Sequence, residues 1–254
     1  MGAGEILLLL TLGLAAGVVS TIAGGAGILV YPGLVFLGLS PVAANATTYV
    51  ALAPAVFVAA WVERAQTPAV TPPTARAHAS AFVGTLVGAA ALTATGEAAF
   101  RLIVPAMLGL ATALFWLAPD LHRRMARGGG ERFGPGVLAA FFAGGVYSGY
   151  FGTGFGILLL ALLRFAGVED ILRANRMKNL MGATTSLAGI GFFFGATELV
   201  SWPHGAVVIA GNIVGGALGA RLAQIVPAEA IRRFVVGFGA TLTIVFAWRN
   251  WIAP

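Results

Sequence analysis

Two glycine clusters interrupt long apolar runs of this sequence. The first is AGGAG at residues 23–27, and the second is GTGFG at residues 152–156. Each glycine weakens an α-helix by about 1 kcal/mol relative to alanine, so we expect a helix break at both clusters. A helix that restarts after such a break presents unpaired backbone N–H groups and the positive end of its dipole. Two such helix ends could together bind a small anion.

Polar residues that follow the clusters are further candidates for the lining of this site. Asn45 and Asn175 stand at the starts of two long apolar segments, where Asn could instead be a helix N-cap. Lys178 could attract an anion, or could extend toward the membrane surface from the end of its helix. The predicted substrate-binding residues are Gly24, Gly25, Gly27, Asn45, Thr47, Thr48, Thr153, Gly154, Gly156, Asn175, Lys178 and Asn179.

The composition is that of a membrane protein. Of 254 residues, 59% are hydrophobic and only 9% are charged, whereas about 25% are charged in soluble domains. The formal net charge of +6 comes mostly from short basic connections between apolar runs. Such connections orient membrane proteins, so we expect the lipid bilayer as a partner and no nucleic acid. The expected location is the plasma membrane, crossed several times.

The sequence lacks the motifs of several classes of enzyme. The sequence has no cysteine, which excludes thiolate metal sites and disulfides. It has no HExxH, GxSxG or P-loop motif, and no Asp or Glu stands in the middle of an apolar segment. We therefore expect a protein that is not an enzyme, needs no cofactor or metal, and does not couple transport to protons through a carboxylate.

Apolar segments of two lengths should form the membrane domain. Eight have 17 residues or more, enough to cross a hydrocarbon core of about 30 Å. Two have 12 residues, follow the glycine clusters, and either cross the membrane or re-enter it. The predicted segments are residues 6–22, 28–39, 46–62, 77–95, 101–118, 135–151, 155–166, 179–195, 205–222 and 234–251.

The second half of the sequence repeats the first at an offset of 129 to 131 residues. Residues 27–29 match residues 156–158, and Arg101 matches Arg232. Five segments in each half reverse the chain an odd number of times, so the halves enter the membrane from opposite sides. We predict an all-α integral membrane protein with an inverted repeat, about eight full transmembrane helices and two short broken or re-entrant helices. The predicted division is residues 1–118 for the first repeat, 119–134 for a basic cytoplasmic linker and 135–254 for the second repeat, all in one membrane domain.

The order and spacing of four motifs resemble the TauE/SafE sulfite exporter family of membrane transporters over nearly the whole chain. The motifs are AGGAGILVYPGLVFLGLSPVAANATTYVALAP, GYFGTGFGILLLALL, RANRMKNLMG and GNIVGGALGARLAQIVPAEAIRRF. The resemblance implies transport of sulfite, sulfonates and related sulfur-containing or organic anions across the plasma membrane. One departure concerns Thr48, which stands where the family pattern usually has a second Asn, so selectivity could differ there.

We therefore predict a transporter of small anions, working as an exporter, with its site at the middle of the membrane. Expulsion of one negative charge gains about 2.3 kcal/mol per 100 mV of membrane potential. The alternatives are an anion channel and a structural subunit of a membrane assembly. A homo-oligomer is compatible with the sequence. Glycines that are spaced rather than clustered should instead bring helices together, and these are Gly13/Gly17, Gly84/Gly88, Gly145/Gly149 and Gly211/Gly215/Gly219.

Overall fold

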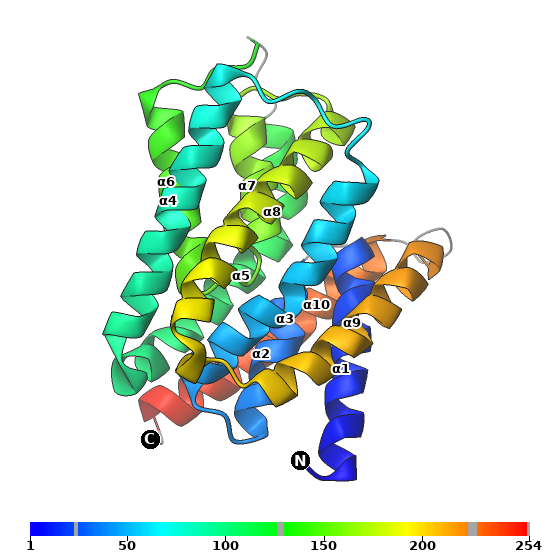
Figure 1. Ribbon diagram of the computed structural model, residues 1–254, viewed down its shortest axis with the longest axis vertical. Helices are drawn as coiled ribbons and strands as arrows, with labels where there is room; N and C mark the ends of the chain where they lie inside the picture. The colour runs from blue at the N-terminus through cyan, green and yellow to red at the C-terminus, as the bar shows by residue number, and fades with distance from the viewer. Residues whose placement is uncertain (23–24, 126–129, 223–227, 253–254) are drawn as a thin grey trace.

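The computed structural model describes residues 1–22, 25–125, 130–222 and 228–252, and their regular elements are all helical (Figure 1). Each predicted apolar segment overlaps a helix, and the ends differ by up to eight residues. The α-helices are α1 (Ala3–Ile22), α2 (Gly27–Phe36), α3 (Pro41–Val62), α4 (Pro72–Thr95), α5 (Glu97–Met125), α6 (Pro135–Tyr150), α7 (Phe155–Phe165), α8 (Ile171–Gly195), α9 (Trp202–Leu222) and α10 (Ala228–Ala247). Two short turns complete them, the 3-10 turn η1 (Thr197–Leu199) and the π-helical turn η2 (Trp248–Ile252).

Within the described residues, five helices are long and apolar enough to cross a membrane, so the expected number of eight is not confirmed. They lie at Ala3–Ser20, Pro41–Val62, Pro72–Thr95, Glu97–Leu117 and Glu229–Ile252. Helix α6 falls short because it has 16 residues. Helix α8 carries Lys178, Asn179 and a Thr-Thr-Ser run along its length, which lowers its hydropathy. The two short apolar helices that were predicted are present as α2 and α7, with 10 and 11 residues.

Several helix connections lie at the two ends of the bundle in Figure 1. The α3–α4 and α7–α8 connections lie at the upper end. The α2–α3, α4–α5 and α8–α9 connections lie at the lower end, together with both chain termini. Basic side chains flank the upper connections, among them Arg64 and Arg173, and Arg173 forms an ion pair of 2.9 Å with Glu131. The basic connections of the described chain are therefore concentrated on one side.

Two helix pairs pack closely through their glycines. A Cβ atom built on Gly17 of α1 would lie 2.3 Å from the carbonyl oxygen of Asn212 in α9. A Cβ atom on Gly149 of α6 would lie 1.9 Å from the carbonyl oxygen of Thr85 in α4. Real Cβ atoms do not approach a backbone so closely. The contact between α1 and α9 therefore requires glycine at position 17, and the contact between α4 and α6 requires glycine at position 149. The predicted packing role of the spaced glycines is confirmed at these positions.

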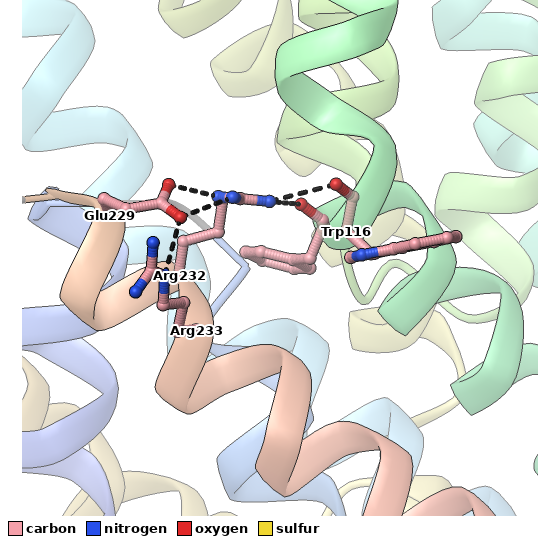
Figure 2. A network of polar contacts seen from close by, with 5 residues as sticks. Trp116, Glu229, Arg232 and Arg233 are labelled. Atoms are coloured by element: carbon pink, nitrogen blue, oxygen red, sulfur yellow. Dashed lines mark hydrogen bonds and ion pairs between the residues drawn. The ribbon is translucent and has the colours of Figure 1, made fainter.

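Helix α5 contains Pro119, which has no N–H to donate to the carbonyl oxygen of Phe115 one turn earlier. The side chain of Arg232 in α10 supplies donors instead. Its Nη1 lies 3.4 Å from that oxygen and 2.9 Å from the carbonyl oxygen of Trp116, and Glu229 holds the same guanidinium at 2.7 and 2.8 Å (Figure 2). An unpaired carbonyl is costly within a membrane, so this contact fixes the start of α10 against α5.

The other end of α10 meets α5 in a similar way. Pro105 leaves the carbonyl oxygen of Arg101 without its helical donor, and the Nδ2 of Asn250 binds that oxygen at 3.0 Å. The indole N–H of Trp251 donates to the next carbonyl, that of Leu102, at 2.9 Å. Side chains from both ends of the α10–η2 unit therefore replace backbone hydrogen bonds that the prolines of α5 cannot make.

Candidate functional site

The two helix breaks lie against each other. The chain leaves helical geometry between α1 and α2, with residues 25–26 described, and again between α6 and α7 at residues 151–154. A Cβ atom on Gly27 would lie 2.6 Å from the Oγ1 of Thr153, so the first cluster touches the second. Gly24 lies outside the described residues. Gly27 and Gly156 were predicted within the breaks, but Gly27 is the first residue of α2 and Gly156 belongs to the first turn of α7.

Backbone geometry explains why glycine occupies the centre of each break. Gly25 has φ of +76° and Gly154 has φ of +81°, both in the left-handed region that other residues rarely adopt. Gly154 is also the N-cap of α7. A Cβ atom on Gly25 would in addition lie 1.7 Å from the ring of Phe115. Each position therefore excludes a side chain for conformation, and Gly25 excludes one for space as well.

Unpaired N–H groups are found at the start of α7. The first turn pairs Phe155 N with the Gly152 carbonyl and Ile157 N with the Gly154 carbonyl, both at 3.1 Å. The N–H groups of Gly154 and Gly156 donate to no acceptor in the described part of the chain. In a membrane such donors need a partner from protein, water or ligand.

A cavity of about 370 Å³ opens where the breaks meet. It is bounded by the breaks and by facing stretches of α3 and α8, and its lining reaches Glu63 at the end of α3, where the α3–α4 connection begins. Most of the predicted site residues line it. They are Gly25, Gly27, Thr48, Thr153, Gly154, Gly156, Asn175, Lys178 and Asn179.

Two predicted site residues lie outside the cavity lining. Asn45 is buried, and its Nδ2 donates to the carbonyl oxygen of Tyr150 at 2.9 Å. Tyr150 is the last residue of α6, so Asn45 binds a carbonyl close to the second break. The hydroxyl oxygen of Thr47 accepts a hydrogen bond from the N–H of Ser201 at 2.9 Å. Both side chains make structural contacts in this conformation.

The alternative role of Asn45 and Asn175 as N-caps is wrong. Helix α3 begins earlier, at Pro41, and its N-cap is Ser40, whose hydroxyl accepts from Ala43 N at 3.3 Å. Helix α8 begins after Asp170, whose carboxylate accepts from two backbone N–H groups of the first turn. Each Asn stands inside its helix, because the polar residues ahead of each apolar run are also helical.

Glu63 is a cavity residue that the sequence did not single out. It is the C-cap of α3, next to Arg64, and resembles an ordinary residue at a membrane surface. Its carboxylate accepts a hydrogen bond of 2.7 Å from the Nδ2 of Asn179. These two residues are 116 positions apart, so no local pattern could have connected them. Tyr49, another lining residue, was also missed, and its hydroxyl donates to the Thr185 carbonyl of α8 at 3.0 Å.

The lining combines a polar end with apolar walls. Among the described lining residues, Glu63 and Lys178 are the two that carry charge. The side chain of Lys178 forms no hydrogen bond or ion pair with a described residue, whereas Asn179 beside it is held by Glu63. Leu52, Val56 and Leu159 supply apolar surface nearby. The cavity thus offers a small ligand the cation of Lys178, which shares the cavity with the carboxylate of Glu63, together with backbone N–H donors.

The fold and this site define a class of protein, an all-helical membrane protein with a polar cavity between two broken helices. The comparison with known families identifies the class further. The family described as "Sulfite exporter TauE/SafE" matches residues 9–246 of the chain. The chain therefore belongs to the TauE/SafE family and is a membrane transporter, as the sequence motifs indicated.

Bacterial relatives carry corresponding names. The "Probable membrane transporter protein YfcA" of Escherichia coli K12 is 27% identical over 238 residues, which cover 90% of this chain and 84% of the relative. A "Probable membrane transporter protein" of Haemophilus influenzae is 27% identical over 257 residues, covering 93% of this chain and 92% of the relative. No solved structure gives a significant match.

Proposed function

We propose that this protein carries small anions, of the sulfite, sulfonate or related organic class, out of the cell across the plasma membrane. The observation that carries the proposal is the cavity at the two helix breaks, which combines Lys178 with the unpaired N–H groups of Gly154 and Gly156. A lysine and the N-terminus of a helix both attract anions, and the apolar walls strengthen that attraction by excluding water. The residues that line the cavity favour binding and transport of an anion over enzymatic chemistry.

The proposal includes an inverted repeat of residues 1–118 and 135–254, with the linker 119–134 on the cytoplasmic side. Helix pairing supports it. The repeat offset relates α1 to α6 and α4 to α9, so the close α1–α9 pair is equivalent to the close α4–α6 pair. The short helices α2 and α7 follow the two breaks in the same order. Sites between such repeats are typical of carriers that work by alternating access.

A carrier is favoured over an anion channel by contacts at the lower end of the bundle. The Glu97 carboxylate accepts from the Ser40 hydroxyl at 2.5 Å and from Val42 N at 3.2 Å, which joins the starts of α3 and α5. Asn45 binds Tyr150 between these contacts and the cavity. A cavity that extends toward one end while the other is tied together is the arrangement of one state of an alternating cycle.

Removal of the cavity lysine should weaken anion binding. Lys178→Gln is expected to raise the Kd for sulfite or methanesulfonate at least about tenfold, because a charge-assisted hydrogen bond contributes about 1.5–3 kcal/mol. Lys178→Arg should retain more affinity. Calorimetric titration of the purified protein measures both, and acetate and sulfate complete the panel. Arg249→Gln is the matched control, since it removes an exposed positive charge outside the cavity lining.

The affinities of the Lys178→Gln and Arg249→Gln variants distinguish binding at a specific site from attraction to the overall positive charge of the protein. Equal affinity in the wild type and in folded Lys178→Gln would contradict the proposed site. An equal loss in Lys178→Gln and Arg249→Gln would indicate attraction to overall positive charge. If no anion of the panel binds the wild type, the proposed function itself fails.

A further inference from the structure

Glu63 places a negative charge inside a cavity proposed to receive anions. Its side chain is half-buried at the end of α3, it lines the cavity together with Lys178, and it accepts the hydrogen bond from Asn179. With Glu63 ionised and Lys178 charged, the described lining has no net charge. An arriving monoanion would then share one lysine with a carboxylate that already occupies the same space.

Other charged groups near Glu63 are directed elsewhere. On α8, Arg176 reaches the Gln66 carbonyl at 3.5 Å, and Arg173 pairs with Glu131. Arg64 lies over the Trp61 ring, 4.0 Å from its centroid. The remaining titratable or charged groups described on neighbouring elements of this end are Arg76 and His78 on α4, Arg132 before α6, Arg164 on α7, and Glu169 and Asp170 before α8. None of these is in the cavity lining, so Lys178 is the described cation that shares the cavity with Glu63.

We propose that Glu63 couples anion binding to the uptake of one proton, in contrast to the sequence-based expectation that no carboxylate couples transport to protons. The inference rests on the proposed anion site. When the cavity is empty, Glu63 is ionised and Lys178 balances it. When a monoanion binds at Lys178, two negative charges share one cavity and repel each other. A proton from water then forms an O–H bond on the carboxylate of Glu63, and the anion, Lys178 and neutral Glu63 together restore charge balance.

The coupling has a definite sign and selects a class of substrate. Because protonation of Glu63 removes the repulsion, proton binding and anion binding favour each other. Anion affinity should therefore be higher at low pH than at high pH, and it should fall by at most about tenfold per pH unit. A monoanion can be balanced by one lysine and one proton, whereas a dianion leaves excess charge. The site therefore prefers monoanions.

Methanesulfonate is a suitable probe because its sulfonate group stays ionised across the relevant pH range. We expect its Kd for the purified wild-type protein to rise at least about tenfold between about pH 5.5 and about pH 8. Calorimetry in buffers of different ionisation enthalpy should show uptake of protons on binding. Glu63→Gln mimics the protonated carboxylate, so it should bind tightly at both pH values without proton uptake. Glu198→Gln is the matched control, because Glu198 is exposed in the α8–α9 connection and should keep the wild-type profile.

A second variant tests the same coupling without altering Glu63. Asn179→Leu removes the 2.7 Å hydrogen bond that stabilises the ionised carboxylate, so the pH at which affinity falls should move upward. Methanesulfonate binding with a flat pH profile and no proton uptake would overturn the inference while the anion site stood. So would a Glu63→Gln variant that keeps the wild-type profile. Absence of methanesulfonate binding in the wild type at every pH would instead reject the proposed function, and this inference with it.

Discussion

Gly156→Leu is expected to abolish anion transport in a protein that still folds. Gly156 lies in the first turn of α7 and lines the cavity, and a Cβ atom built on it meets no atom within 4 Å. Its φ is not positive, so leucine can adopt the backbone conformation and is a better helix former than glycine. The new side chain would extend into the cavity of about 370 Å³, beside the proposed donors. Transport by purified protein in proteoliposomes measures the effect.

Gly191→Leu provides the matched control for this substitution. Gly191 is an exposed glycine of α8 that also has open space around its built Cβ atom, but it does not line the cavity. It should transport at close to the wild-type rate. Thermal unfolding in detergent should show both variants folded. A folded Gly156→Leu variant with normal transport would show that the ligand does not pass the start of α7.

Gly149→Ala is expected to cause the largest loss of stability. The added methyl group would lie 1.9 Å from the Thr85 carbonyl oxygen and 2.7 Å from Ala89 N, both backbone atoms of α4. Neither atom can move without displacing a helix, so α4 and α6 must separate along their contact. Overpacking of a rigid core costs about 1–3 kcal/mol or more. The transition in detergent should therefore move to a clearly lower temperature, with a lower yield of folded protein.

Gly136→Ala tests whether this loss is specific to the contact. Gly136 is in the first turn of the same helix, and a Cβ atom there meets nothing within 4 Å. The substitution should leave stability unchanged or raise it slightly, because alanine is the better helix former. Similar melting of the two variants and the wild type would mean that α4 and α6 are not held as closely as the glycine contacts require.

Much of the architecture could be predicted because it depends on local composition. Apolar runs and glycine clusters gave the positions of the helices and both breaks, and the spaced glycines indicated close helix contacts. The expected number of membrane-crossing helices is not confirmed: within the described residues α6 is short, and α8 carries polar residues along its length. Polar side chains that line the cavity, such as Lys178 and Asn179, make α8 less apolar than a helix that faces only lipid.

The candidate site could be predicted only where its residues belong to the breaks or follow them in sequence. Gly25, Gly154 and Lys178 were found in this way. Glu63 was not, because its partner Asn179 comes from the other half of the chain and its own surroundings look like a membrane surface. The role of Asn45 was also hidden, because Tyr150, whose carbonyl it binds, is brought close only by the fold.

The position of the anion can be tested directly by protection of a single thiol. The chain has no cysteine, so Ser186→Cys introduces one thiol, in the cavity lining on α8. Methanesulfonate at about ten times its Kd should slow the reaction of this thiol with N-ethylmaleimide about tenfold, while leaving Ala69→Cys, in the exposed α3–α4 connection, unaffected. If the Ser186→Cys thiol reacts equally fast with and without an anion that titration shows to be bound, the anion lies elsewhere and the cavity between the two breaks is not its site.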